Sequence, residues 1–109
     1  MSDDAIVVFM TAANGEEATR LAEMLVGAHL AACVQILPEM ESVYRWQGKI
    51  ERQSEVLLIA KTTQGKFDDL EREVRALHSY ETPEIVAVPI VTGSAPYLEW
   101  LIKTADSRE

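Results

Sequence analysis

The stretch Val43-Tyr44-Arg45-Trp46-Gln47-Gly48-Lys49-Ile50 decides the fold of this chain. Its first half is rich in β-branched and aromatic residues, which favour an extended strand. Gln47 and Gly48 then have the character of a tight hairpin turn, because glycine tolerates the positive φ angle that such a turn requires. Residues 50–62 include an apolar run and predict a long return strand. The centre of the chain is therefore predicted to be a long β-hairpin.

Before the hairpin, the sequence predicts a strand, a helix and another strand. Residues 6–10 form a β-branched run that is typical of a strand. Asn14 is a predicted helix N-cap, with Glu17 in the capping-box position three residues later. Apolar side chains then recur on one helical face. Residues 31–37 predict the second strand, which we expect Pro38 to interrupt before strand character resumes in the hairpin.

After the hairpin, the sequence predicts a helix, a strand and a final helix. Apolar side chains between residues 67 and 77 fall on one stripe of a helix. Residues 85–91 predict a fourth strand, and Pro89 favours an edge or a bulge because proline cannot donate to a ladder. Ser94 is the predicted cap of the last helix. The predicted order is βαββαβ with a C-terminal helix.

This order is typical of an α/β (α+β) fold of the ferredoxin-like kind, in which right-handed crossovers place both linking helices on one face of the sheet. The apolar runs at residues 56–60 and 85–88 do not alternate with polar residues, which is typical of strands buried on both faces. One short third helix is too small to hide a whole sheet face. We therefore expect other copies of the chain to cover the second face. The alternative is that the third helix covers more of it.

Length and composition limit the class of protein. A chain of 109 residues supports one domain, residues 1–109. Its net charge of −8 and its scattered basic residues disfavour nucleic acid as a partner, although an acidic surface attracts cations or simply keeps the protein soluble. We expect no membrane partner, since no apolar run approaches the roughly 20 residues of a span. The acidic start and the single Cys33 favour a cytoplasmic location.

The candidate metal ligands are soft. Cys33, His78 and Met10 offer a thiolate, an imidazole and a thioether, a set that suits Cu(I) better than a hard cation. The alternatives are that Cys33 is packing material in an apolar strand and that His78 complements a helix end. Three carboxylates near the hairpin are alternative weak ligands for Mg²⁺ or Ca²⁺: Glu39, Glu41 and Glu51. No zinc, nucleotide-binding or nucleophile motif is present, so we expect no catalysis and no required cofactor, with copper as the candidate ion.

Aromatic and polar residues near strand ends are candidates for a ligand-binding cleft. Tyr44 and Trp46 lie near the hairpin tip, where large aromatic side chains anchor an interface or line a pocket. Lys61 ends the third strand, and Tyr80 and Glu84 flank the turn at residue 83. The alternatives are cross-strand packing for the aromatic residues and ordinary surface positions for the polar ones.

Several segments of the chain, in order and spacing, closely resemble the CutA family of divalent-cation tolerance proteins. The resemblance extends from residue 6 to residue 102 and rests on these motifs: LAACVQILP at 30–38, SVYRWQGKIE at 42–51, KTT at 61–63, HSYETPEI at 78–85 and YLEWL at 97–101. It implies a ferredoxin-like fold similar to the PII signalling proteins and a tight homotrimer whose long hairpins pair with neighbouring subunits. It also implies a role in copper and divalent-cation tolerance.

The resemblance further implies a set of cleft residues. The positions that match those lining a cleft between subunits are Cys33, Tyr44, Trp46, Lys61, His78, Tyr80 and Glu84. Two positions depart from members linked to copper binding, which carry a cysteine where this chain has Met10 and a second histidine where it has Leu77. These departures disfavour a strong Cu(II) site, whereas the Met10 thioether retains affinity for Cu(I).

The sequence supports three hypotheses about function. The first is a non-catalytic homotrimer that binds a metal ion or a small ligand at the subunit cleft. The second is a PII-like sensor of an anionic metabolite or nucleotide, with Lys61 and Arg45 as charge partners. The third is a cleft enzyme that uses His78 or Glu84 in acid–base chemistry.

Overall fold

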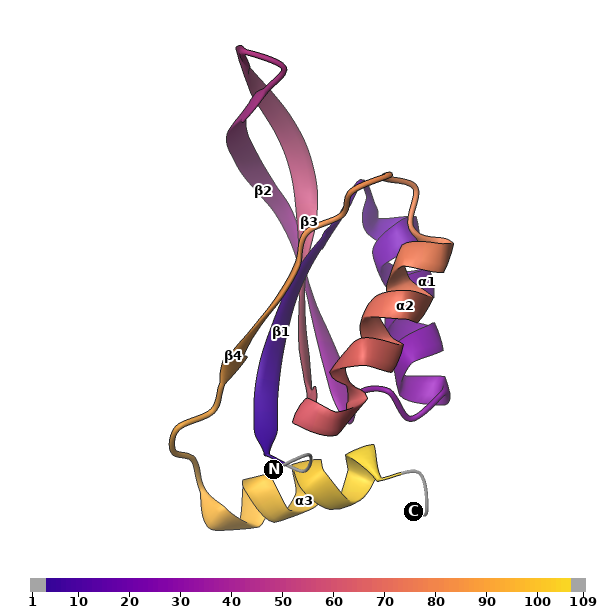
Figure 1. Cartoon of the computed structure of the whole chain (residues 1–109), viewed down its shortest axis with the longest axis vertical. Coiled ribbons are helices and arrows are strands. Elements are labelled where there is room, and N and C mark those ends of the chain that lie inside the picture. The colour runs from indigo at the N-terminus through magenta and orange to yellow at the C-terminus, as the bar shows by residue number, and fades with distance from the viewer. Residues whose placement is uncertain (1–3, 107–109) are drawn as a thin grey trace.

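The predicted order of elements is confirmed. The computed structural model describes residues 4–106, so the first three residues of the acidic start lie outside the described part of the chain. Figure 1 shows a sheet with a projecting hairpin, two helices packed on one side and a third helix across one end. The elements are β1 (Ala5–Ala12), α1 (Gly15–Gly27), β2 (Cys33–Trp46), β3 (Lys49–Thr63), the 3-10 turn η1 (Gln64–Lys66), α2 (Phe67–Leu77), β4 (Ile85–Pro89) and α3 (Ala95–Ala105). None of the helices within residues 4–106 has the length and apolar character needed to cross a membrane.

The sheet has the ferredoxin-like arrangement. Its strand order is β2-β3-β1-β4, and each neighbouring pair is antiparallel. The connection through α1 therefore skips over β3, and the connection through α2 skips over β1. Both helices consequently lie on the same face (Figure 1). The edge position expected from Pro89 is confirmed, although β4 ends at Pro89 rather than at residue 91.

The closed face of the sheet carries the core. Alternate residues of the two central strands point toward the helices, because successive side chains of a strand point to opposite faces. On β1 these are Ile6, Val8 and Met10, and each is at most 2% exposed. They pack with Leu21 and Leu25 of α1 and with further apolar side chains of α2 and β3. This face needs no other chain to cover it.

The start of α1 is capped as expected, with one difference. The Asn14 side chain accepts a hydrogen bond from the Glu17 backbone N–H at 2.8 Å. The Glu17 carboxylate reaches back to the backbone N–H of Ala13, at 2.9 Å. A regular capping box would return the bond to the cap residue itself. Here the Glu17 carboxylate instead holds Ala13, in the short connection between β1 and α1.

The predicted hairpin turn is confirmed. Gln47 and Gly48 have φ angles of 50° and 81° and connect the paired residues Trp46 and Lys49. Positive φ at both central positions is the geometry of a type I′ turn, whose twist matches that of the two strands.

The expected break at Pro38 is wrong, because β2 runs through this position without ending. Between Leu37 and Met40, the residues Pro38 and Glu39 lie opposite the single residue Val56. Such a bulge leaves one residue outside the ladder, so the missing N–H of proline costs no hydrogen bond. Glu39 takes the positive φ of 62° that re-aligns the strand.

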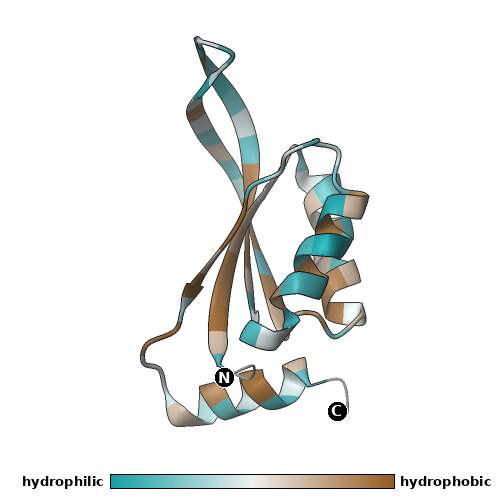
Figure 2. Ribbon diagram, viewed as in Figure 1, coloured by the Kyte–Doolittle hydropathy of each residue, from teal (hydrophilic) through white to brown (hydrophobic). Residues whose placement is uncertain are grey.

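The opposite face of the sheet, which we call the open face, is apolar and has no helix over it. It carries alternate residues of the strands, among them Phe9, Leu57, Val86 and Val88. Val86 and Val88 are 50% and 44% exposed. Helix α3 lies across the end of the sheet and buries only a small cluster around Leu101. Figure 2 shows the hydrophobic stretches of β1 and β4 on which this face is built. The expectation that α3 leaves a sheet face uncovered is confirmed for the single chain.

We expect Asn14→Ala to lower the free energy of unfolding by about 1 kcal/mol, because the first turn of α1 loses its cap. Asn14→Ser is the matched control, since serine also caps helices and should recover most of the loss. Urea denaturation at one fixed protein concentration measures both variants. Equal stability of the alanine variant and the original protein would contradict the capping role.

Candidate functional site

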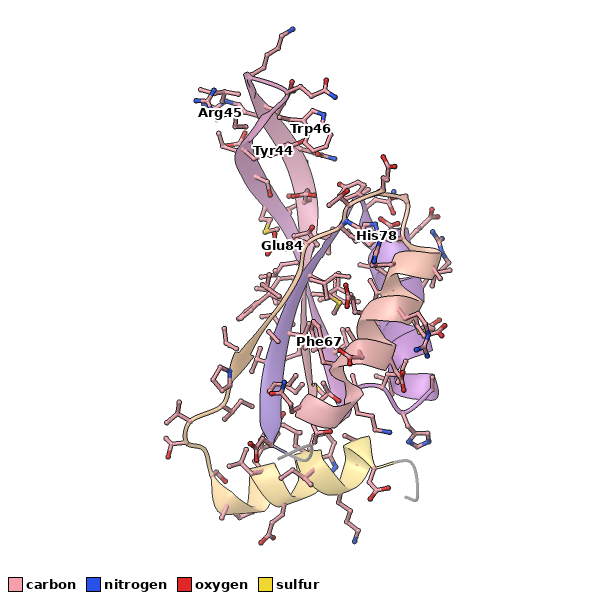
Figure 3. All side chains as sticks on the ribbon, viewed as in Figure 1. Tyr44, Arg45, Trp46, Phe67, His78 and Glu84 are labelled. Atoms are coloured by element: carbon pink, nitrogen blue, oxygen red, sulfur yellow. The ribbon has the colours of Figure 1, made fainter. Side chains whose placement is uncertain are left out.

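A pocket of about 610 Å³ lies where the hairpin leaves the body of the sheet. One wall comes from the hairpin and the other from the segment that connects α2 to β4. Its lining residues Thr11, Gln53 and Glu55 share the strand alternation of Leu57, so the pocket belongs to the open face. Figure 3 shows Tyr44 and Trp46 on the hairpin and Glu84 near its base. The remaining lining residues are Ser42, Val43, Tyr80, Glu81 and Thr82.

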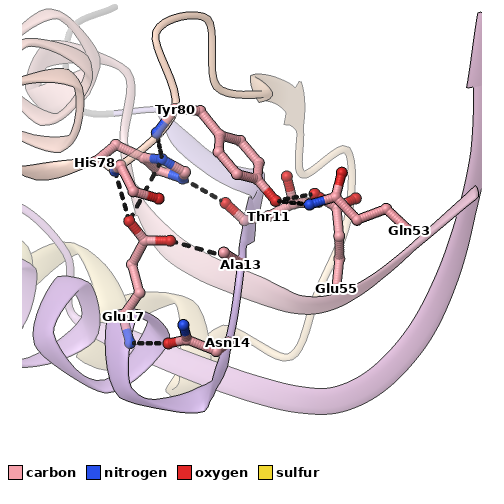
Figure 4. Close-up of polar contacts among 9 residues, drawn as sticks. Thr11, Ala13, Asn14, Glu17, Gln53, Glu55, His78 and Tyr80 are labelled. Carbon is pink, nitrogen blue, oxygen red and sulfur yellow. Dashed lines mark hydrogen bonds and ion pairs between the residues drawn. The ribbon is translucent and has the colours of Figure 1, made fainter. Parts of the chain in front are cut away.

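A chain of hydrogen bonds runs along the pocket wall, and Figure 4 shows its part between Gln53, Tyr80 and Glu55. The Tyr44 hydroxyl donates to Oε1 of Gln53 at 2.7 Å, and Nε2 of Gln53 donates to the Tyr80 hydroxyl at 2.8 Å. The Tyr80 hydroxyl in turn donates to Oε2 of Glu55 at 2.8 Å. Burial raises the pKa of Tyr80, and the hydrogen bond to Glu55 and the charge of that carboxylate raise it further. Tyr80 is therefore held as a neutral phenol that donates to Glu55.

The charge in the pocket is negative. Three carboxylates line it, from Glu55, Glu81 and Glu84, and no lysine, arginine or histidine among the described residues does so. The Glu55 side chain is the most enclosed of them, because the residue is only 7% exposed. Buried carboxylates are costly unless they are hydrogen-bonded or paired with a positive charge. The single bond from Tyr80 leaves this need only partly met.

A second network holds Tyr80 in place from behind. The His78 side chain is 0% exposed, with Nε2 lying 2.7 Å from the Thr11 carbonyl oxygen. The Tyr80 backbone N–H donates to Nδ1 of His78 at 3.0 Å, so Nδ1 carries no proton and Nε2 is the donor. The Ser79 backbone N–H donates to Oε2 of Glu17 at 2.6 Å. Residues 78–80 are thus fastened to the end of β1 and the start of α1.

Glu17 is the charged member of this second network. Burial by itself raises the pKa of its carboxyl, but hydrogen bonds from the backbone N–H groups of Ala13 and Ser79 and from the Ser79 side chain outweigh that effect. The pKa of Glu17 is therefore held below its ordinary value of 4.5. The residue is 2% exposed and carries its charge where two otherwise separate chain segments meet.

The structure brings together four of the five predicted cleft residues, namely Tyr44, Trp46, Tyr80 and Glu84. Lys61 lies elsewhere on the open face. It pairs with Val7 across the sheet, four residues along β1 from Thr11 of the pocket, which is about 13 Å at the usual rise of a strand. Its Nζ donates to Oε1 of Gln35 at 2.7 Å and lies 5.7 Å from the centre of the Tyr97 ring.

The structure does not bring Cys33, Met10 and His78 together within one chain. Met10 is fully buried on the closed face, whereas Cys33 pairs with Lys61 and lies half-buried on the open face. Both ring nitrogens of His78 are already engaged near the other end of the sheet. Met10 and Cys33 are separated by strand alternation, which directs their side chains to opposite faces of the sheet.

The described residues also contain no cluster of carboxylates that could hold a hard cation such as Mg²⁺ or Ca²⁺. Across residues 4–106, no three His, Cys, Asp or Glu side chains gather closely enough to hold a metal ion. Of the carboxylates proposed near the hairpin, Glu41 lies 3.4 Å from Arg52 in an exposed ion pair. Glu39 occupies the bulge of β2, and Glu51 pairs with Tyr44 across the hairpin.

Sequence reasoning missed most of the other residues of the site, and three of them carry its hydrogen bonds. Gln53 and Glu55 carry the hydrogen bonds between the two tyrosines, and Glu17 was predicted only as part of a helix cap. A signal for Glu55 is present, since this charged residue directly precedes the apolar run 56–60 within β3 and shares the alternation of Leu57. The bond from Glu17 to Ser79 spans 62 positions and has no local signal.

Comparison with known proteins gives one consistent family. The model of the CutA1 divalent ion tolerance protein family matches residues 6–104. The chloroplastic CutA protein of Arabidopsis thaliana is 50% identical over 97 residues, which are 89% of this chain but 53% of that protein. The chain therefore spans about half the length of this relative and of a similar rice protein. The divalent-cation tolerance protein CutA of Thermus thermophilus is 48% identical over 87% of this chain and 92% of that protein.

Solved structures agree with the sequence relatives. The Thermus thermophilus divalent cation tolerance protein superimposes with a TM-score of 0.90 at 46% identity, over 92% of this chain and 97% of that chain. CutA of Xylella fastidiosa superimposes with a TM-score of 0.92 at 38% identity, over 94% and 99% of the two chains.

We expect Glu17→Gln to lower stability at neutral pH by about 1–3 kcal/mol, because an amide leaves buried backbone donors poorly satisfied. The same change should flatten the acid dependence of stability. The folded-state pKa of Glu17 is depressed, so its contribution is complete above the unfolded value of 4.5 and is lost as the pH falls through the lower folded value.

Urea denaturation between about pH 7 and pH 3 checks both statements, since linkage appears as a difference in slope below pH 4.5. Glu16→Gln is the matched control, because Glu16 is exposed in the same first turn of α1. Parallel curves for Glu17→Gln and the original protein would contradict this role of the carboxylate.

Proposed function

The chain belongs to the CutA1 divalent ion tolerance family. From this premise we propose that it assembles as three copies and binds a small ligand or a metal ion at the pocket of the open face. We propose that it does so without catalysis. The observation that carries the proposal is the pocket itself. Its volume of about 610 Å³ lies within the range of about 300–1,000 Å³ that is usual for small-molecule sites. It also combines aromatic walls with a small set of polar groups.

The open face supports assembly. Large apolar side chains that stay half-exposed across a sheet are typical of a surface that a partner covers. The hairpin extends the molecule to 44 Å along its longest axis, so it projects beyond the rest of the chain. Trp46 near its tip is 56% exposed and within reach of a neighbour. A second copy is the economical partner, and the CutA resemblance sets the expected number at three.

The positions of Lys61, Arg45 and His78 favour this reading over its rivals. A sensor of anions needs basic side chains in the pocket, yet Lys61 lies toward α3 and Arg45 lies on the side of the hairpin opposite Trp46 (Figure 3). An enzyme that uses His78 needs a free ring nitrogen, and both are engaged in hydrogen bonds. Binding without catalysis at the carboxylate and aromatic pocket therefore accounts better for the arrangement.

Cu(I) at Cys33 is a second candidate function. The observation that favours it is the half-buried position of Cys33 on the open face, where another copy would supply the further soft ligands that its own chain lacks. The compartment we propose is the cytoplasm, because the single cysteine suits a reducing environment. Some relatives carry the words chloroplastic or periplasmic in their names.

We expect sedimentation equilibrium to give three times the 12.1 kDa mass of one chain at micromolar concentration.

Trp46→Ala should weaken the assembly more than Trp100→Ala, because truncating a central aromatic anchor costs on the order of 2 kcal/mol or more. Trp100 is the matched control, since it lies on α3 beside Tyr97. A monomer, or equal dissociation constants for the two variants, would contradict this interface.

We expect competition against a Cu(I) chelator to show affinity that falls on Cys33→Ser and changes little on Glu39→Gln. The thiolate is the softest ligand of the chain and selects Cu(I), whereas the carboxylate prefers hard cations. Equal Cu(I) affinity of the original protein and Cys33→Ser would remove copper from the proposal and leave the small-ligand pocket.

A further inference from the structure

We propose that the pocket takes an organic cation, in which an ammonium or guanidinium group is attached to an apolar body. This inference rests on the proposed function, because it names the chemical class of the ligand at the same site. The relatives are named for tolerance of divalent cations, and nothing in those names identifies an organic ligand.

The first argument is the unmet demand of Glu55. Glu55 is only 7% exposed, and its Oε2 accepts the hydrogen bond from the Tyr80 hydroxyl. No donor from residues 4–106 reaches its Oε1. Among side-chain polar atoms of the described residues, only Thr62 Oγ1 is both fully buried and without a partner, so Oε1 of Glu55 is not fully buried, and Glu55 lines the pocket. A cationic donor in the pocket would satisfy this oxygen and neutralise its charge.

The second argument is the charge of the whole pocket. Glu81 and Glu84 add to the charge of Glu55, and none of the three forms an ion pair with another described residue. The chain as a whole carries a net charge of −8, which raises the local concentration of cations at its surface. An anionic ligand would meet three uncompensated carboxylates here.

The third argument separates an organic cation from a metal ion. A metal ion needs several ligand atoms within roughly 2.0–2.6 Å of one point. The described acidic residues offer no such group of three, and the pocket volume of about 610 Å³ is far larger than an ion. The carboxylates are instead spread around a space that an extended molecule fills.

The fourth argument is the aromatic wall. Tyr44, Trp46 and Tyr80 line the same pocket as the carboxylates. The faces of aromatic rings attract ammonium and guanidinium groups and also pack against apolar atoms. Because the Tyr80 hydroxyl already donates to Glu55, the ring and the carboxylate are held together as one preformed surface.

The test uses three compounds of similar size and different charge: 2-phenylethylamine, 2-phenylethanol and phenylacetate. Each is titrated into the intact assembled protein at pH 7, and the indole N–H signals of Trp46 and Trp100 are followed by NMR. Trp46 lines the pocket, whereas Trp100 on α3 serves as an internal reference. We expect the amine to shift the Trp46 signal saturably, with an affinity about tenfold or more above that of the alcohol and of phenylacetate.

Variants assign the preference to Glu55. Glu55→Gln keeps an acceptor for the Tyr80 hydroxyl but removes the charge, so we expect the amine and the alcohol to bind alike. Glu84→Gln, at the exposed rim, should reduce the preference in part. Glu23→Gln is the matched control, because Glu23 is exposed on α1 and does not line the pocket.

The outcomes separate this inference from the proposed function. If neither the three compounds nor calcium chloride shifts the Trp46 signal, the proposed ligand pocket fails together with the inference. If phenylacetate or the alcohol binds as tightly as the amine, or calcium binds and the amine does not, the pocket stands and the organic-cation inference is overturned. An unchanged preference in both Glu55→Gln and Glu84→Gln would overturn it as well.

Discussion

The buried carboxylate of Glu17 is the interaction on which the candidate site depends. It accepts hydrogen bonds from Ala13, at the junction of β1 and α1, and from Ser79, just after α2. These two segments are far apart in the sequence, and no apolar contact would fix their relative position as sharply as two charge-assisted hydrogen bonds. The tie places Tyr80 where its side chain reaches the open face. The bonds of His78 to Thr11 and to the Tyr80 backbone N–H complete the anchoring of the pocket wall.

The two hydrogen-bond networks have different roles: one supports the pocket wall from behind, and the other forms the wall itself. His78 and Glu17 lie behind the pocket, fully engaged with backbone groups, and they position Tyr80 without being able to meet a ligand. Tyr80 and Glu55 lie on the side that faces the pocket. A histidine near a cleft invites a catalytic or metal-binding interpretation, but in this chain its hydrogen bonds make it a structural support of the pocket wall.

The order of the elements, the capped helix starts and the hairpin turn were predictable, because each depends on residues that are neighbours in the sequence. The continuation of β2 through Pro38 was not predictable, because the proline is accommodated by a bulge opposite Val56 on the neighbouring strand. Four cleft residues were found from their aromatic or polar character at strand ends. Gln53 and Glu55 were missed, because a polar residue in a strand has no visible role until the opposite side chain is known.

The sequence by itself determined the ferredoxin-like fold, its family and the apolar character of both sheet faces, because periodicity and turn chemistry are local properties. Only the tertiary structure decided which of the predicted site residues meet. Cys33 and Met10 both lie in apolar strands, yet register and alternation send them to opposite faces. Register depends on which face of each strand is buried and on the turn that joins a hairpin, so it is fixed only when strands far apart in the sequence pair, as β1 does with β3. Strand register therefore keeps the candidate metal ligands Cys33 and Met10 apart, whereas it places Glu55 beside the aromatic residues of the pocket.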